Sequence, residues 1–398
     1  MRNLVNLLTL ATAVAASFAA IAPAAADGVE VRLATLAPDG SSWMKILGKG
    51  AAEIDKKTEG RVKVKYYAGG VQGDERDVVR KMNLGQLDGA AVTSVGLSMV
   101  DESIRVLELP RMFNTVEELD YVADKMWPYF VKKFAGKGYK LGDRGDVGWI
   151  YFMSKSEIKN VGSLKSSKVW MWGDDSIVRA MYKKLGVSGV PLGVPEVEPA
   201  LTTGRINACY GSPLAAVALQ WNTKIKYVTS MPISFSIGAT IIKTDSLNKI
   251  SADDQKLMAK IAKGMQKTLR KQIRKDNDSA LKQMERKGVK ISATSDAMIA
   301  DADKAAQDVW KELTGKVFSK DMMKPSVHRL GHKEVEDAIA AVGRECTRRG
   351  VPPPTVTLSV GQLNAVTSAV NNAAAQAAAA RNASRAAPPP APGARPRR

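Results

Sequence analysis

The sequence predicts an α/β protein with two units in series, each a mostly parallel sheet with helices on both faces. Long C-terminal helices and a disordered tail follow. Three observations support this prediction. Strand and helix patterns alternate from residue 29 to 93, the alternation restarts from 148 to 210, and a helical apolar stripe follows residue 250. Such alternation is typical of parallel sheets, because each crossover helix returns the chain to the end of the sheet where the previous strand began.

The first unit opens with a strand at 29–33, where Val29, Val31 and Leu33 alternate with polar residues. A turn at 37–40 follows, and Ser41 or Ser42 can cap the next helix. The other elements expected in this unit are a helix from Trp43 toward Lys57, a strand at 61–67, a helix at 74–84 and a buried strand at 90–93.

The second unit repeats this alternation of short apolar runs and helical patterns. Its expected strands are 148–153, 168–172, 189–192 and 206–210, and its expected helices are 176–185 and 196–203.

The C-terminal part is expected to be helical. Ser251, with Asp254 three residues later, forms a start that resembles a capping box. The predicted core-facing stripe of this long helix is Leu257, Ile261, Met265, Leu269 and Ile273. Beyond the three prolines at 352–354, residues 373–380 could be helical. The Pro, Ala, Gly and Arg residues of 386–398 cannot bury enough apolar surface to fold, so a disordered basic tail is predicted.

Residues 1–26 have the pattern of a secretory signal peptide. Arg2 supplies a positive start, 4–20 is largely apolar, and three alanines at 24–26 precede Asp27. A transmembrane anchor is the alternative, but the apolar run is short for a span. We therefore expect export, and the absence of a cysteine at the cleavage site argues against a lipid anchor. Two cysteines, Cys209 and Cys346, do not make a disulfide scaffold, and their pairing stays open.

The formal charge of +19 comes from 59 basic and 40 acidic residues. Such a charge suits a nucleic-acid binder, but the expected export, the spread of the charges and the lack of an aromatic-basic repeat argue against one. We expect a solvated basic surface. The tail holds five arginines in the last 18 residues, so weak contact of this basic tail with anionic envelope polymers is possible.

Catalytic residues are scarce, so no enzyme, cofactor or metal is expected. The only histidines are His328 and His332, whose spacing of four suits zinc on a helix. The residues between them include no acidic partner, and Gly331 weakens the helix. Neither a nucleophile elbow nor a phosphate-binding loop is present in the sequence.

Several short blocks, in order along the chain, resemble the periplasmic solute-binding subunit of TRAP transporters, the dicarboxylate-type (DctP-like) family. Each block alone is weak, but their order and spacing over roughly residues 29–285 are fairly specific. The blocks are KTEGRV at 57–62, QGDER at 72–76, GQLDG at 85–89, ELPRMF at 108–113, EVEPALTTGRIN at 196–207 and SPL at 212–214.

The resemblance implies a two-lobed periplasmic binding protein that closes on a small ligand and delivers it to a separate TRAP-type membrane permease. The implied parts are lobe I, 27–145 plus about 237–279; lobe II, 146–236 plus about 280–345; and a C-terminal extension, 346–398. A cleft between two such lobes is also the default pocket on physical grounds.

The strand at 168–172 departs from the family. There the family usually reads K-x-R-V-P, and its arginine grips a carboxylate through two parallel hydrogen bonds. This chain has Trp170 at the arginine position and Trp172 at the proline position. A second position that is often basic in the family falls around Trp149 and Ile150, and a position that is often polar falls at Gly211 or Ser212. The residues with which the family usually binds an anion are therefore all replaced in this chain.

Two readings of the aromatic residues compete. In one, rings line the cleft around an apolar ligand; in the other, they pack the second lobe. Alternation places Trp170 and Trp172 on one face of their strand. The candidate ligand contacts are Trp170, Trp172, Trp149, Tyr210, Gly211, Ser212, Trp43, Arg76 and Arg144.

An apolar or amphipathic ligand ranks first. An organic acid held by a relocated cation, Arg144 or Arg76, ranks second. A cationic solute near Asp146, Asp174 and Asp175 ranks third, although these acids suit helix caps and surface positions better. A secreted sensor or carrier that works without a permease is a further alternative, because the region beyond residue 300 could dock a partner.

Overall fold

The computed structural model describes residues 28–173 and 175–323. The predicted signal peptide, Asp174, both histidines, Cys346 and the basic tail lie outside the described residues. Two compact units are distinguished: one runs to Met112 and resumes over Asp124–Met322, and the other holds Phe113–Ala123 and the chain from Met323 on. The site described below lies within the first unit.

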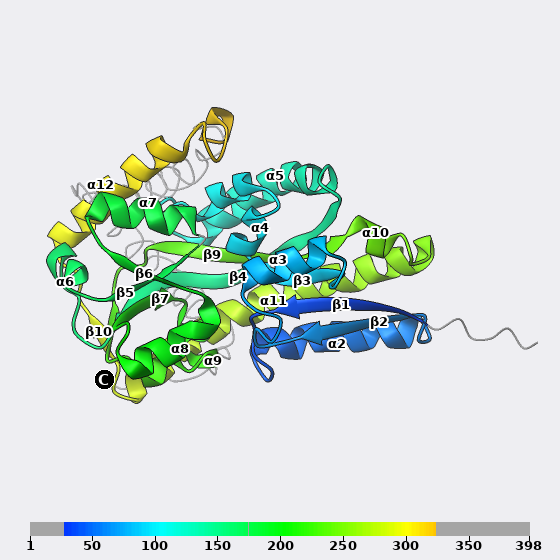
Figure 1. Cartoon of the computed structure of the whole chain (residues 1–398), viewed down its shortest axis with the longest axis horizontal. Helices are drawn as coiled ribbons and strands as arrows, with labels where there is room; N and C mark the ends of the chain where they lie inside the picture. The colour runs from blue at the N-terminus through cyan, green and yellow to red at the C-terminus, as the bar shows by residue number, and fades with distance from the viewer. Residues whose placement is uncertain (1–27, 174, 324–398) are drawn as a thin grey trace, which may run out of the picture. The chain divides into compact units, whose positions relative to one another are not determined.

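A continuous sheet organises the first unit (Figure 1). In the described part of the chain it has ten strands, ordered β2-β1-β3-β9-β4-β7-β5-β6, with β8 pairing to both β4 and β10. The strands are β1 Val29–Thr35, β2 Val62–Tyr67, β3 Gly89–Thr93, β4 Tyr139–Ser154, β5 Val169–Trp172, β6 Gly189–Leu192, β7 Ala208–Gly211, β8 Tyr227–Thr229, β9 Ser234–Lys243 and β10 Lys290–Ser292.

The sheet has two parallel parts joined by two antiparallel strands. In the first part β1 pairs in parallel with β2 and β3, and in the second β5 pairs in parallel with β6 and β7. Between them, β4 runs antiparallel to β9 from Tyr139 to Ile150 and to β7 and β8 over its last residues, Tyr151 to Ser154. The mixed α/β architecture with mostly parallel sheets is confirmed, and β4 and β9 are the strands that cross from one part to the other.

The pattern-based prediction did not include β9 or the first half of β4. The predicted strand 148–153 is the end of a 16-residue strand, in which two register shifts, Leu141/Arg144 and Asp146/Gly148, break the alternation of buried and exposed residues. Such bulges hide a strand from period-two patterns. In β9, by contrast, Phe235, Ile237, Ala239 and Ile241 are buried in strict alternation, so its pattern was visible in the sequence.

The helices agree well with the sequence pattern where it was strong. Ser41 caps α2 by accepting from the Met44 amide, and the bounds of α7 match the prediction. The α-helices are α2 Ser42–Lys57, α3 Glu75–Asn83, α4 Ser94–Ser98, α5 Val116–Ala135, α6 Val161–Lys165, α7 Ser176–Leu185, α8 Val194–Thr203, α9 Pro213–Ala218, α10 Thr244–Leu247, α11 Ala252–Arg286 and α12 Asp296–Leu313. The 3-10 segments are η2 Glu102–Glu108, η3 Trp221–Thr223 and η4 Lys320–Met323.

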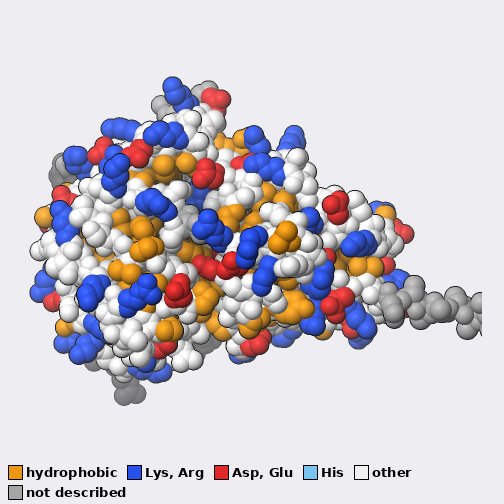
Figure 2. Space-filling model, in the orientation of Figure 1, with side chains coloured by type: hydrophobic (Ala, Val, Ile, Leu, Met, Phe, Trp, Pro, Cys, Tyr) orange, Lys and Arg blue, Asp and Glu red, His pale blue; other side chains and the backbone are white. Residues whose placement is uncertain are grey.

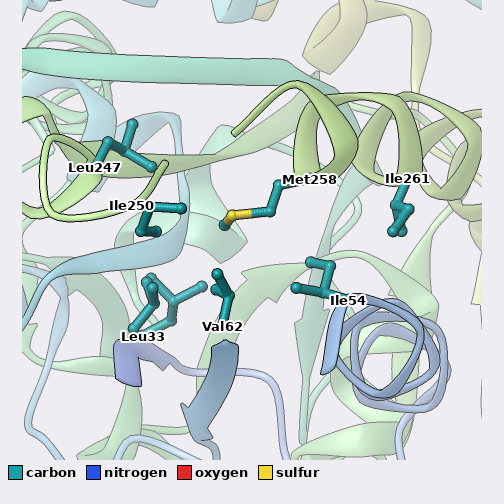
Figure 3. Close-up of a cluster of buried hydrophobic side chains, with 8 residues drawn as sticks. Leu33, Ile54, Val62, Leu247, Ile250, Met258 and Ile261 are labelled. Carbon is teal, nitrogen blue, oxygen red and sulfur yellow. The ribbon is translucent and has the colours of Figure 1, made fainter. Parts of the chain in front are cut away.

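The core beneath the first part of the sheet joins β1, β2, α2 and the start of α11. Figure 3 shows these side chains pointing toward one another. Their burial removes apolar surface from water, which is the main favourable term in folding. The buried members are Val31, Leu33, Ile54, Val62, Leu247, Ile250, Met258 and Ile261.

Helix α11 supports the sheet with one buried face, and Ser251 caps it as predicted. It packs against α2, β4 and α9. Ile261, Leu269 and Ile273 of the predicted stripe are buried, but Met258 and Gln266 are buried where Leu257 and Met265 were expected. The reason is geometric: a helix has 3.6 residues per turn, so a strict four-residue series rotates away from the core.

Two further features bear on function. Cys209 is buried on β7, and its pairing with Cys346 falls outside the described residues. Across residues 28–173 and 175–323, none of the helices has both the length and the apolar character needed to cross a membrane.

Truncation of the α11 core should be costly. Ile273 has 0% of its surface exposed and packs with Leu214, Leu269 and Ala280. We expect Ile273→Ala to lower the free energy of unfolding by about 2–5 kcal/mol, because it leaves a cavity. The exposed Gln283→Ala on the same helix should change it by less than about 0.5 kcal/mol. Urea denaturation of both variants makes the comparison, and equal losses would contradict the described packing of α11.

Candidate functional site

A cavity of about 230 Å³ lies where the two parallel parts of the sheet meet the crossing strands. Its wall combines residues from the β1–α2 turn, α3, β3, α4 and η2 with residues from β5, α7, α8, β7, α9 and η3. Strands β4 and β9 and helix α11 also contribute. Open α/β sheets bind ligands at the ends of their strands, and this cavity occupies such a place.

An aromatic cluster forms one side of the cavity. Trp170 stacks on Tyr210 with ring centroids 4.6 Å apart, and lies 6.0 Å from Trp172 in a second stacked pair. Trp221 meets Trp170 edge-on at 5.5 Å. All four side chains line the cavity. Offset and edge-on pairs of this kind stabilise each other beyond simple burial.

Trp170 is at once a packed residue and a wall residue. Only 2% of its surface is exposed, and its indole N–H donates to the Leu192 carbonyl at 3.0 Å. Its own carbonyl accepts from the Tyr182 hydroxyl at 2.8 Å. The two readings of the sequence are therefore compatible, because neighbouring rings cover much of Trp170 while it still borders the cavity.

Trp172 links the second part of the sheet to the first. Its indole N–H donates to Asp74 Oδ2 at 2.7 Å, and Asp74 is the N-cap of α3. The backbone also comes close here, since a Cβ on Gly193 would lie 2.8 Å from Asp74 Oδ2. A side chain at position 193 would therefore push the Asp74 carboxylate out of its present position.

A buried charged cluster forms a second side of the cavity. Arg105 pairs with Glu108 at 2.9 Å and with Asp175 at 2.7 Å, and Ser94 bonds to both Arg105 and Glu108. Burial opposes the charge of Arg105, but the two carboxylates outweigh it and raise its pKa. Burial likewise raises the pKa of Glu108, against the pull of Arg105. The charge of Arg105 is therefore balanced within the protein.

Glu75 is a second buried carboxyl on the wall. It accepts hydrogen bonds from the Thr93 amide at 2.7 Å, the Thr93 hydroxyl at 2.8 Å and the Gly96 amide at 2.6 Å. Burial raises its pKa to about 7, although these donors favour the ionised form. Glu75 ties the start of α3 to the turn after β3.

Gln266 of α11 brings a hydrogen-bond acceptor to the wall. Its Nε2 donates to the Asp143 carbonyl at 3.0 Å, which fixes the orientation of the amide. Its Oε1 is buried and has no hydrogen-bond partner in the described part of the protein. Buried polar atoms are normally paired, so this oxygen calls for an explanation.

The structure gathers most of the predicted site residues at one place. Those that line the cavity are Trp43, Trp170, Trp172, Tyr210, Gly211 and Ser212. The other three lie outside its wall. Trp149 packs edge-on against Phe235 at 5.2 Å, Arg76 is exposed on α3, and Arg144 is buried in an ion pair with Asp146 at 3.2 Å. Their contact with a ligand stays a prediction.

Sequence reasoning missed several wall residues. Arg105, Glu108 and Glu75 come from segments whose local pattern gives no hint that they meet. Gln266 did carry a signal, because it is a polar residue beside the apolar stripe of α11. Asp175 was expected to cap a helix, and it does cap α7. Among residues 28–173 and 175–323, no three His, Cys, Asp or Glu side chains gather as metal ligands.

Comparison with known proteins identifies the family. The family model of the bacterial extracellular solute-binding proteins, family 7 (DctP), matches residues 33–316. The chain belongs to this family. Its members are periplasmic solute-binding proteins of TRAP transporters rather than enzymes, so the resemblance read from the sequence is confirmed.

Individual relatives are distant. The chain is 26% identical over 215 residues to the uncharacterised protein YiiZ of Salmonella typhimurium, a match that covers 52% of this chain and 64% of that protein. It is 23% identical over 243 residues to a solute-binding protein of Verminephrobacter eiseniae, covering 61% of this chain and 72% of the relative.

Solved structures show the same fold. A TRAP periplasmic solute-binding protein of Haemophilus influenzae with bound L-gulonate has a TM-score of 0.69 at 20% identity, covering 76% of this chain and 99% of that chain. The sugar acid binding protein DctPAm of Advenella mimigardefordensis, in complex with galactonate, has a TM-score of 0.71 at 18% identity, covering 77% and 99%. The two-lobed fold is thereby confirmed, while the residue boundaries of the lobes stay a prediction.

The raised pKa of Glu75 predicts a pH-dependent stability. Between the ordinary carboxyl value of 4.5 and about 7, the folded protein holds a proton at Glu75 that the unfolded chain releases. Stability from this group is therefore present below pH 4.5 and is lost as pH rises through about 7, by an amount on the order of 3 kcal/mol.

Glu75→Gln cannot ionise, so its stability should lack this fall. Urea denaturation of both proteins at about pH 5 and about pH 8 measures the difference. Parallel pH profiles for the wild type and the variant would show that Glu75 keeps an ordinary pKa.

Proposed function

We propose that the protein captures a small, uncharged amphipathic ligand and delivers it to a separate TRAP-type membrane permease. The observation that carries the proposal is that the arginine on the cavity wall is already ion-paired within the protein. Among the described lining residues Arg105 is the only cationic side chain, and Glu108 and Asp175 already neutralise it.

A carboxylate ligand would meet unfavourable surroundings. To reach Arg105 it would have to compete with two carboxylates that are fixed beside the guanidinium. Like charges in a buried site repel strongly, because little water screens them. The two arginines that the sequence suggested as alternative partners for a carboxylate are poorly placed for this role. Arg76 is exposed, and Arg144 is paired with Asp146.

The aromatic cluster supports an apolar body for the ligand. Trp170, Trp172, Tyr210 and Trp221 present ring surface to the cavity, and Phe152 and Ile177 extend the same apolar wall. A dry cavity of about 150 Å³ accommodates benzene. The cavity here is about 230 Å³, so it suits a compound somewhat larger than one aromatic ring.

Gln266 supports one polar group on the ligand, and that group should be a hydrogen-bond donor. The Oε1 atom of Gln266 can only accept a hydrogen bond, and its Nε2 already donates to the Asp143 carbonyl. Leaving a buried acceptor unpaired costs about 1–3 kcal/mol, which a ligand hydroxyl or amide N–H would recover. An ammonium finds less support, because Asp146 on the same wall is ion-paired to Arg144 and Arg274.

Several structural relatives were solved with sugar acids, such as gulonate and galactonate. Those ligands combine several hydroxyls with one carboxylate. At identities near 20%, the likeness to these structures supports a shared fold but not a shared ligand. The proposal retains a hydroxyl-type contact for this chain and drops the carboxylate contact, in keeping with the prediction from sequence that Trp170 replaces the family's arginine.

The ligand itself can be identified directly. Protein purified from its native periplasm, extracted and examined by mass spectrometry, should release an uncharged compound with an aromatic or alicyclic body. A small organic acid in stoichiometric amount would overturn the proposed ligand class, and would direct attention back to Arg105 as an anion partner.

Gln266→Leu tests the polar end of the ligand. Leucine preserves the volume but removes the acceptor, so we expect the affinity for the co-purified ligand to fall about 10-fold. Gln272→Leu is the matched control on the same helix, because Gln272 bonds to Asp276 and does not line the cavity. Quenching of tryptophan fluorescence measures both affinities. Unchanged binding in Gln266→Leu would show that this oxygen does not hold the ligand.

A further inference from the structure

Helix α11 carries a run of basic residues without any acidic one. The 21 residues from Gln255 to Lys275 include eight Lys or Arg and no Asp or Glu. The chain has 40 acidic residues in 398, so a stretch of this length would ordinarily hold about two. On the face drawn in Figure 2, Lys and Arg side chains lie among uncharged and acidic ones.

The lysines of α11 form a line along the helix. They recur every three or four residues and all are exposed, while the opposite face buries the apolar residues that support the sheet. At 1.5 Å of rise per residue the line is about 28 Å long. We call it the lysine face: Lys256, Lys260, Lys263, Lys267, Lys271 and Lys275.

The lysine face has little neutralising charge of its own. Lys256 pairs with Asp253 at 3.1 Å. For the other five lysines, no ion pair occurs within residues 28–173 and 175–323. The arginines of the same run point elsewhere: Arg270 reaches Asp124 at 3.9 Å and Arg274 reaches Asp146 at 2.6 Å. The line of charge is therefore open to a partner.

The positions between the lysines indicate what kind of partner fits. Exposed residues there are small, such as Ala259, Gly264 and Thr268, and none of the exposed large apolar residues of the described chain lies on α11. A surface without aromatic or apolar anchors cannot stack on bases or insert into a groove. It suits a broad, fluid layer of negative charge.

We propose that the lysine face binds the anionic phospholipid surface of a membrane. Such contact would concentrate the protein beside the membrane in which its permease resides, whatever ligand the cavity holds. Each lysine near an anionic bilayer strengthens binding by a factor of about five. The contact is purely electrostatic and should weaken sharply as salt shortens the Debye length.

The test compares vesicles of phosphatidylglycerol and phosphatidylcholine with vesicles of phosphatidylcholine alone, by co-sedimentation of the full-length protein. The variant replaces Lys260, Lys263, Lys267 and Lys271 with Gln, which has a similar helix propensity. Its binding to the anionic vesicles should fall by about 100-fold or more.

Two matched controls separate the lysine face from general charge. One replaces the exposed Lys132, Lys133, Lys165 and Lys168 with Gln, which removes the same charge elsewhere. The other replaces the five arginines of residues 381–398 with Gln. Both should bind nearly as well as the wild type, and thermal unfolding should confirm that every variant is folded.

Several outcomes would overturn the proposal. Equal losses in the α11 variant and the first control would mean that only net charge matters. A loss confined to the tail variant would move the contact to the tail. If the wild type bound neither vesicle, or bound only when an acidic protein was present in the bilayer, the partner would not be phospholipid.

Discussion

A guanidinium buried in a protein interior requires carboxylates beside it, and this requirement governs the wall of the cavity. Arg105 is 2% exposed, and its two partners come from different parts of the fold. Glu108 lies on the same 3-10 segment, while Asp175 caps α7 beyond β5. Glu108 also accepts from the Ile237 amide of β9 at 2.5 Å. One buried charge thus holds together η2, a crossing strand and the second parallel part of the sheet.

The same contacts limit how the cavity can open. Any motion that separates β5 from α3 must break the Trp172–Asp74 hydrogen bond, and any motion that separates α7 from η2 must break the Arg105–Asp175 pair. Breaking either interaction costs less free energy when water enters the cavity, because the separated groups then form hydrogen bonds to water. A ligand that displaces water from the cavity therefore favours the arrangement in which these bonds are intact.

Strong local periodicity made much of the fold predictable. The bounds of β6 and α7 agree with the sequence pattern, and Ser251 caps α11 as expected. The charged first half of β4 was missed, because Arg144 and Asp146 sit at bulges where alternation fails. Trp170 was identified as a site residue, but no local pattern could reveal that Tyr210 and Trp221 would cover its ring. Contacts between distant segments depend on the whole fold.

Trp170, which the sequence resemblance places at the family's arginine position, is consistent with the charge balance of this wall. An arginine that awaits a ligand carboxylate remains a buried, uncompensated cation whenever the cleft closes empty, and such a state is strongly disfavoured. Here the charge of Arg105 is compensated by Glu108 and Asp175 without any ligand, and the Trp170 indole N–H donates to the Leu192 carbonyl. Two buried oxygens of the wall accept no hydrogen bond in the described residues: Asp146 Oδ1, which is ion-paired to Arg144, and Gln266 Oε1. An uncharged donor is therefore the ligand group that we propose for the site, because it adds no buried charge.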